Sequence, residues 1–156
     1  PQQAADILQR HGVVAQHMVL EITESAVMDD LPRAQTTLAQ LARQGFRLSI
    51  DDFGTGHSSL AYLQQLPVQE LKLDRSFVAG LSHSAGDRVI VASTIEMAHA
   101  LGLKVVAEGV EQASDFEQLA TMGCDVAQGY WISRPLPGDA MCDWVNARAP
   151  ADTPCP

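Results

Sequence analysis

The sequence has 156 residues, is 46% hydrophobic and carries a net charge of −9. This length and hydrophobic content are enough for one domain with a real core. The negative charge, without a run of lysines or arginines, argues against a nucleic-acid polymer or an anionic membrane as partner. No signal peptide or membrane-spanning run is evident, and the three cysteines (Cys124, Cys142 and Cys155) are odd in number and widely spaced. We therefore expect a reducing, cytoplasmic setting, although a longer parent protein with a membrane anchor is compatible with it.

Strand-like and helix-like segments alternate along the chain after a short helical segment at 4–9. We predict strands at 18–23, 47–51, 70–74, 104–108 and 125–130. We predict helices at 30–44, 58–66, 87–101, 114–122 and 138–147, followed by a loose tail at 149–156. This alternation predicts a parallel α/β fold.

The alternation of apolar and polar residues along each predicted strand indicates which kind of parallel α/β fold the chain adopts. One face of the strands is apolar, with Leu20, Ile22, Leu48, Ile50, Leu71, Leu73, Val105 and Ala107. The other face carries polar and charged residues toward the strand ends, with Glu21, Ser49, Asp51, Lys72, Asp74, Lys104 and Glu108. An apolar outside and a charged inside are typical of a (β/α) barrel, which needs eight strands and roughly 250 residues. We therefore predict about five β/α units, the C-terminal portion of a TIM (β/α)8 barrel. Helix 87–101 is expected to bury Ile90, Thr94, Met97, Ala98 and Leu101.

Carboxylates follow the predicted strands at the edge where active sites of such barrels lie. Asp51 and Asp52 are adjacent at a strand end and repel each other unless a cation lies between them. Other strand ends contribute Glu21, Glu24, Asp74 and Glu108, with Lys72 pointing inward and Gln128 on the last strand. Oxygen ligands favour Mg²⁺ or Mn²⁺ over zinc, and two-metal sites serve phosphoester displacement. Two simpler readings stay open: Asp51 and Asp52 cap a helix, and Lys72 pairs only with Asp74 or Glu70.

Several motifs, in order over residues 18–137, resemble the EAL-domain family of bacterial cyclic-di-GMP phosphodiesterases. They are EITES (21–25), DDFGTGHSSL (51–60), LKLDRSFV (71–78), VAEGVE (106–111) and AQGY (127–130). The resemblance implies a modified TIM barrel that hydrolyses cyclic di-GMP to linear pGpG with two Mg²⁺ or Mn²⁺ ions. It also implies a homodimer and, in a longer parent protein, an upstream regulatory or GGDEF-type domain.

The resemblance also implies a role for each matching residue. Glu21 would bind the first metal, Asp51 would bridge both metals, and Asp52 would bind the second. Glu108 would lie beside the second metal and act as general base, and Lys72 would hold the attacking water or the scissile phosphate. Glu24 would anchor the loop that contains Gly54, Thr55 and Gly56. Glu111 and Gln128 would lie near the ligand, and Asp74 belongs to a motif without a defined role.

The Glu-Ala-Leu motif and the metal-binding Asn of the family have no counterpart in this sequence, and we expect both upstream of Pro1. We therefore expect a partial EAL domain at 1–148 with a tail at 149–156, active in the parent protein and inactive alone. One alternative is a non-catalytic cyclic-di-GMP receptor of the same fold. Another is an inert fragment that dimerises through the edge of its first strand.

Overall fold

The structure is a computed structural model that describes residues 1–54 and 60–148. Its strands are β1 (Val19–Thr23), β2 (Arg47–Phe53), β3 (Glu70–Leu73), β4 (Lys104–Ala107) and β5 (Val126–Ala127). Its longer helices are α1 (Gln2–His11), α3 (Leu31–Arg43), α6 (Ala85–Ala100), α7 (Ala113–Thr121) and α8 (Gly138–Asn146). Its shorter helical segments are η1 (Ala15–His17), α2 (Glu24–Asp29), α4 (Leu60–Leu63) and α5 (Arg75–Val78). None of the described helices is long and apolar enough to cross a membrane.

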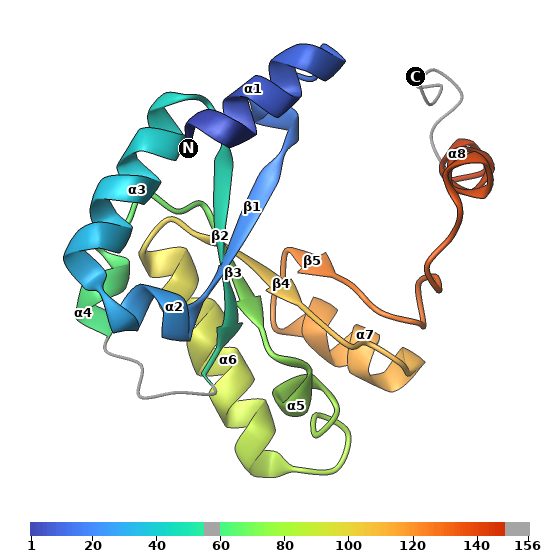
Figure 1. The fold of residues 1–156 in the computed structure, drawn as a ribbon. Helices are drawn as coiled ribbons and strands as arrows, with labels where there is room; N and C mark the ends of the chain where they lie inside the picture. The colour runs from blue at the N-terminus through green and yellow to red at the C-terminus, as the bar shows by residue number, and fades with distance from the viewer. Residues whose placement is uncertain (55–59, 149–156) are drawn as a thin grey trace.

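The five strands form one parallel sheet in the order β1-β2-β3-β4-β5 (Figure 1). The register places Glu21 beside Ser49 and Lys72 beside Val106. Because the strands are parallel, all of their carboxyl ends lie at one edge of the sheet. The predicted parallel α/β fold is confirmed, and this edge carries the candidate site.

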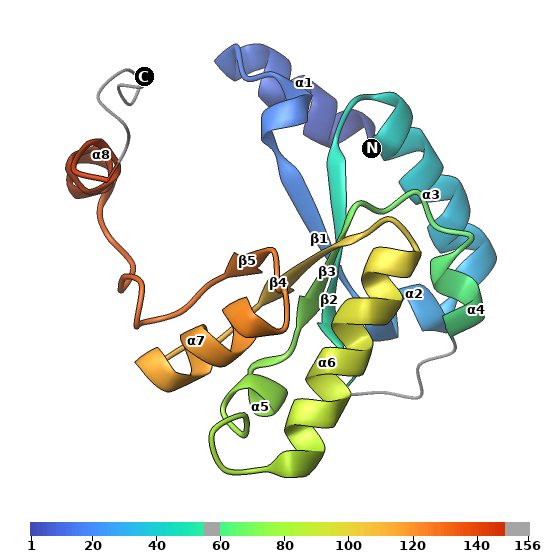
Figure 2. The same cartoon turned by 180° about the vertical axis from the view of Figure 1, so that it is seen from behind.

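The apolar face of the sheet packs against helices. Leu48, Ile50, Leu71 and Val105 are fully buried in a core that also contains Leu38 of α3 and Ile95 of α6. Figure 2 shows α6 in front of the central strands, whereas the strands lie in front of it in the opposite view of Figure 1. Burying a leucine or isoleucine side chain stabilises a fold by about 1.5–3 kcal/mol. This one-sided core leaves the other face of the sheet to polar groups, as strand parity predicts.

The boundaries of the long helices follow from local signals in the sequence. Asp30 begins α3 by accepting a hydrogen bond from the Arg33 N–H at 3.1 Å, and Ser84 begins α6 by accepting one from Asp87 at 3.1 Å. Gly45 and Gly102 follow the helix ends with φ of 91° and 76°, where a glycine is favoured. The predicted helices 30–44 and 87–101 therefore agree with α3 and α6 within two residues.

Some predicted elements differ from the structure. The last predicted strand, 125–130, contains only the two residues of β5, because the chain then turns along the Val110 backbone. The predicted packing of Ile90 into the core is wrong, since its side chain is 44% exposed on α6. The described part of predicted helix 58–66 is helical only in α4, and the predicted tail 149–156 lies outside the described residues. The pattern also missed α2 and α5, which begin directly at strand ends.

Candidate metal centre

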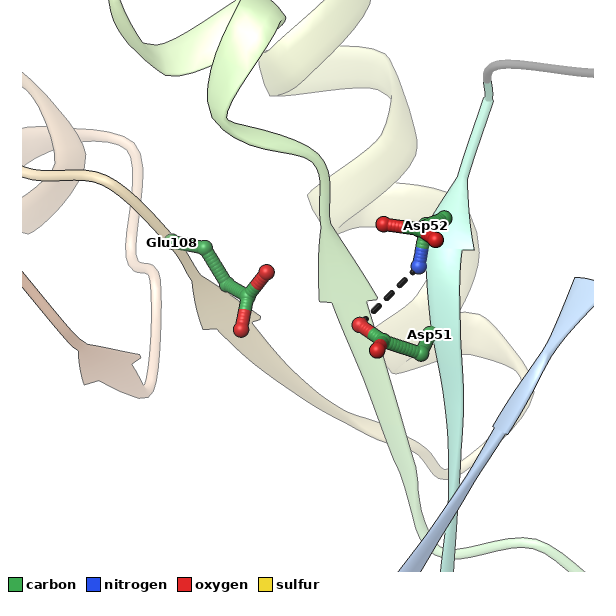
Figure 3. Close-up of side chains that lie close together, drawn as sticks. All are labelled: Asp51, Asp52 and Glu108. Atoms are coloured by element: carbon green, nitrogen blue, oxygen red, sulfur yellow. Dashed lines mark hydrogen bonds between the residues drawn. The ribbon is translucent and has the colours of Figure 1, made fainter.

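Three carboxylates converge at the carboxyl edge of the sheet. Asp51 and Asp52 come from β2 and Glu108 follows β4, and Figure 3 shows them pointing toward one another across β3. One ligand oxygen from each lies within 4.8 Å of the other two. Carboxylate oxygens are the ligands that Mg²⁺ and Mn²⁺ prefer, so the donor set fits the divalent cation that the sequence predicts.

The backbone of β2 explains how two consecutive side chains reach one site. Successive residues of a regular strand point to opposite faces, so Asp52 would normally point away from Asp51. Pairing between β2 and β3 is irregular between Ile50 and Phe53, and Asp52 has a φ of 54°, rare for a residue with a side chain. Its N–H donates a hydrogen bond to Asp51 Oδ1 at 3.0 Å. This local departure from strand geometry brings both carboxylates to the same edge.

Lys72 lies between these carboxylates on β3, with a side chain that is only 6% exposed. Its Nζ lies 2.7 Å from Glu21 Oε2, 2.7 Å from Glu108 Oε1 and 3.2 Å from Asp51 Oδ1. Burial by itself would lower the pKa of Lys72, but the hydrogen bonds to Glu108 and Glu21 outweigh it and raise the pKa above the ordinary lysine value. The ammonium group is therefore charged at neutral pH and shared by three carboxylates.

The alternative pairing of Lys72 with Glu70 or Asp74 is wrong. Glu70 pairs with Arg47, near the opposite end of the strands. Asp74 Oδ1 accepts a hydrogen bond from the Ser76 N–H at 3.0 Å and caps α5. The bond from the Ser76 hydroxyl holds the pKa of Asp74 below its usual range. Asp74 thus has a structural contact that the sequence motif did not reveal.

Glu21 and Glu24 take different positions relative to the three carboxylates. Glu21 is 48% exposed and joins them through Lys72 rather than as one of the three. Glu24 is 3% exposed at the start of α2, and its Oε2 accepts a hydrogen bond from the Gly54 N–H at 3.2 Å. Burial and the Glu24 carboxylate raise the pKa of the Tyr62 phenol. Glu24 thus contacts the first residue of the glycine-rich loop, whereas Thr55 and Gly56 lie outside the described residues.

A cavity of about 260 Å³ opens beside Glu108. Its lining residues are Arg75, Glu108, Gly109, Glu111, Gln128, Gly129 and Tyr130. The Val110 N–H donates to the Gln128 carbonyl at 3.0 Å, which holds the two chain segments together. A side chain at position 129 could not be accommodated, because its Cβ would lie 2.2 Å from the Val110 carbonyl oxygen. The cavity therefore brings Glu111 and Gln128 together with Glu108.

Sequence reasoning missed Arg75 and Tyr130 as lining residues of this cavity. Both belong to the motifs that resemble the family, LKLDRSFV and AQGY. Arg75 is out of phase with the inward residues Lys72 and Asp74, whereas Tyr130 shares the parity of Gln128. Tyr130 is 54% exposed, and the Arg134 guanidinium lies 4.6 Å from its ring centre. The available signals were the parity of Tyr130 with Gln128 and the position of Arg75 directly after the predicted strand 70–74.

The arrangement defines a class: a parallel β/α protein whose carboxylates gather around a buried lysine at the carboxyl edge of the sheet. The chain belongs to the EAL domain family, whose family model matches residues 1–135. The sequence resemblance to this family is confirmed.

The comparisons include two curated relatives from Pseudomonas aeruginosa. The bifunctional diguanylate cyclase/cyclic di-GMP phosphodiesterase MucR is 44% identical over 134 residues, which cover 86% of this chain and 20% of MucR. The cyclic di-GMP phosphodiesterase NbdA is 45% identical over 140 residues, which cover 90% of this chain and 18% of NbdA. The chain thus spans about a fifth of the length of these relatives.

Solved structures show the same fold. The PaMucR phosphodiesterase in complex with c-di-GMP matches with a TM-score of 0.85 and 43% identity, over 88% of this chain and 56% of that chain. The manganese/cyclic-di-GMP complex of Klebsiella pneumoniae BlrP1 at pH 9.0 matches with a TM-score of 0.81 and 33% identity, over 86% and 34%. These matches confirm the predicted α/β fold of the barrel type.

Proposed function

We propose that this chain forms the catalytic edge of a phosphodiesterase that hydrolyses cyclic di-GMP to linear pGpG with two Mg²⁺ or Mn²⁺ ions. The observation that carries the proposal is the convergence of Asp51, Asp52 and Glu108 beside the buried Lys72. The names of MucR and NbdA and the manganese complex of BlrP1 support the substrate and the kind of metal.

Each residue of the site has a chemical task in this proposal. Asp51 and Asp52 would hold the cations together with Glu21 and Glu108. Divalent cations, when bound at such a site, lower the pKa of water and stabilise charge on phosphoryl oxygens. Glu108 accepts a proton from the attacking water, and Lys72 donates a hydrogen bond to a phosphate oxygen. Glu111 and Gln128 contact the nucleotide from the adjoining cavity.

The reaction consumes one water molecule. The water oxygen forms a bond to phosphorus as the bond from phosphorus to the ribose 3′ oxygen breaks. The 3′ oxygen leaves in line with the attack and takes up a proton, which gives a free 3′ hydroxyl and a 5′ phosphate. Glu24 acts on this step only indirectly, through the Gly54 N–H at the start of the loop after Asp52.

The proposal is tested by chromatography of cyclic di-GMP incubated with Mg²⁺ or Mn²⁺ and either this chain or a longer polypeptide that contains it. We expect the longer polypeptide to form pGpG and the chain alone to be inactive. Glu108→Ala should lower the rate at least about a hundredfold, the usual contribution of a general base. Glu117→Ala, an exposed acid on α7, is the matched control and should retain the rate. An inactive longer polypeptide that still binds cyclic di-GMP would instead support the receptor alternative.

The setting of the domain is part of the same proposal. We propose that the domain spans residues 1–148, that it is a homodimer in the cytoplasm, and that a GGDEF-type domain regulates it in the same polypeptide. The bifunctional name of MucR supports the last point. Sedimentation at several protein concentrations tests the dimer: we expect a dimer that dissociates on dilution, and a monomer at every concentration would exclude it.

A further inference from the structure

The Lys72 ammonium shares its carboxylate partners with the candidate metal centre. Two of the three carboxylates that converge there, Asp51 and Glu108, also bind Lys72 Nζ, at 3.2 and 2.7 Å. A divalent cation held by these carboxylates would therefore lie a few ångströms from a buried positive charge. Two cations at this separation repel each other, and burial leaves little water between them to screen the repulsion.

The charges of this cluster also require a cation. Glu21, Asp51, Asp52 and Glu108 bring four carboxylates to one edge, and Lys72 is the one lysine that the structure pairs with them among the described residues. Carboxylates held this close destabilise a fold unless a positive charge lies between them. Lys72 supplies that charge from the chain itself, because β3 lies between β2, which carries Asp51 and Asp52, and β4, which Glu108 follows.

We propose that Lys72 is an internal counter-ion that stabilises the carboxylate cluster without metal and thereby weakens divalent-cation binding. The proposal rests on the proposed metal centre but not on hydrolysis of cyclic di-GMP. It gives Lys72 a second role besides contact with phosphate: it sets the metal concentration at which the site fills. A neutral side chain at position 72 should make the fold depend on metal and bind metal more tightly.

The experiment compares wild type and Lys72→Met in two measurements. Thermal unfolding in EDTA should show a lower midpoint for Lys72→Met, and saturating Mn²⁺ should restore most of the difference. Mn²⁺ titration followed by electron paramagnetic resonance should show a dissociation constant smaller than that of wild type, on the order of tenfold. Equal or weaker Mn²⁺ binding by Lys72→Met would overturn the proposal, as would the absence of Mn²⁺ binding in both proteins.

Arg47→Met is the matched control, because Arg47 also forms an ion pair with an acid of a neighbouring strand, but near the opposite end. It should leave the Mn²⁺ dissociation constant unchanged.

If Lys72→Met folds only with Mn²⁺, that result supports the proposal directly. If it does not fold at all, Lys72→Gln replaces it, since the amide is neutral and still donates hydrogen bonds. The same direction of change in Mn²⁺ affinity is then expected, and its absence overturns the proposal. Neither measurement uses catalysis, so an inactive chain leaves both readouts intact.

Discussion

At the residue scale, Gly109 fixes the direction of the chain between Glu108 and Glu111. Its φ is 69°, and an added Cβ would lie 2.5 Å from the Arg75 Cβ. Gly109→Ala should therefore impose both backbone strain and a clash with Arg75, and we expect it to lower the free energy of unfolding by about 2–4 kcal/mol.

Gly102→Ala separates the two effects. Gly102 has a similar φ of 76°, but no atom lies within 4 Å of its added Cβ. We expect Gly102→Ala to lower the free energy of unfolding by about 1 kcal/mol, because alanine is strained in this left-handed backbone conformation. Urea unfolding measures the free energy of unfolding of both variants. If Gly109→Ala and Gly102→Ala lower it equally, the contact with Arg75 is unimportant.

The sequence identified most residues at the edge of the sheet but not how they contact one another. Strand parity was sufficient to place Glu21, Asp51, Lys72 and Glu108 on one face. Parity also implies that the Asp52 side chain points to the opposite face from Asp51. The structure explains why it reaches the same edge: the Asp52 backbone has a left-handed conformation, and the pairing of β2 with β3 is irregular there. The partners of Lys72 depend on distances between strands, which one sequence does not contain.

At the scale of the element, α5 depends on its cap. Asp74 accepts the hydrogen bond from Ser76, which lowers the pKa of Asp74 in the folded state below that in the unfolded chain. Its contribution to stability is therefore fully present above the unfolded pKa, about 4, and is lost as the pH falls through the lower folded value.

Asp74→Ala should accordingly lower the free energy of unfolding by about 1 kcal/mol at pH 7, the usual value of a helix cap. The difference from wild type should shrink as the pH falls below about 4. Chemical unfolding at pH 7 and pH 3 measures both points. Asp139→Ala is the control, because Asp139 lies in the first turn of α8 without forming a side-chain cap there. If Asp74→Ala lowers the free energy of unfolding equally at pH 7 and pH 3, the charged Asp74 carboxylate does not stabilise α5 as a cap.

Long elements were easier to predict than short ones. The helices α3, α6 and α7 repeat an apolar pattern over several turns and end near glycines, so pattern and terminal signals agree. In contrast, α2 and α5 have six and four residues, too few for a helical period to be visible. Their capping residues lie at strand ends, because Thr23 is the last residue of β1 and Asp74 directly follows β3.

At the scale of the whole molecule, metal binding should stabilise the fold. A ligand that binds only the folded state at a hundred times its dissociation constant contributes about 2.7 kcal/mol. For a chain of this size, this raises the unfolding midpoint by roughly 5–10 °C. Mn²⁺ should produce such a shift in calorimetry or circular dichroism, and Asp51→Asn should abolish most of it. Asp139→Asn changes an exposed residue of α8 and should retain the Mn²⁺-induced shift of the unfolding midpoint. Loss of that shift in Asp139→Asn would indicate that Mn²⁺ binds nonspecifically to the acidic surface.

The parallel sheet and its apolar outer face could be predicted from the sequence, because apolar and polar residues alternate along each strand and so indicate which face is buried. The position of α8 could not, since its sequence indicates a helix but not what it packs against. In both views of the molecule α8 lies apart from the sheet (Figures 1 and 2). Most of the site is formed by residues within or directly after strands, which explains why local patterns located it.

The proposed function depends on a divalent cation bound by Asp51 and Asp52 of β2 and by Glu108, which follows β4. The most direct measurement is X-ray diffraction from crystals of the protein grown with Mn²⁺, recorded at the manganese absorption edge. We predict an anomalous peak in contact with Asp51, Asp52 and Glu108, which is lost in crystals of Asp51→Asn. Ordered carboxylates with no manganese peak between them, at a Mn²⁺ concentration far above the dissociation constant measured in solution, would contradict the proposed metal centre.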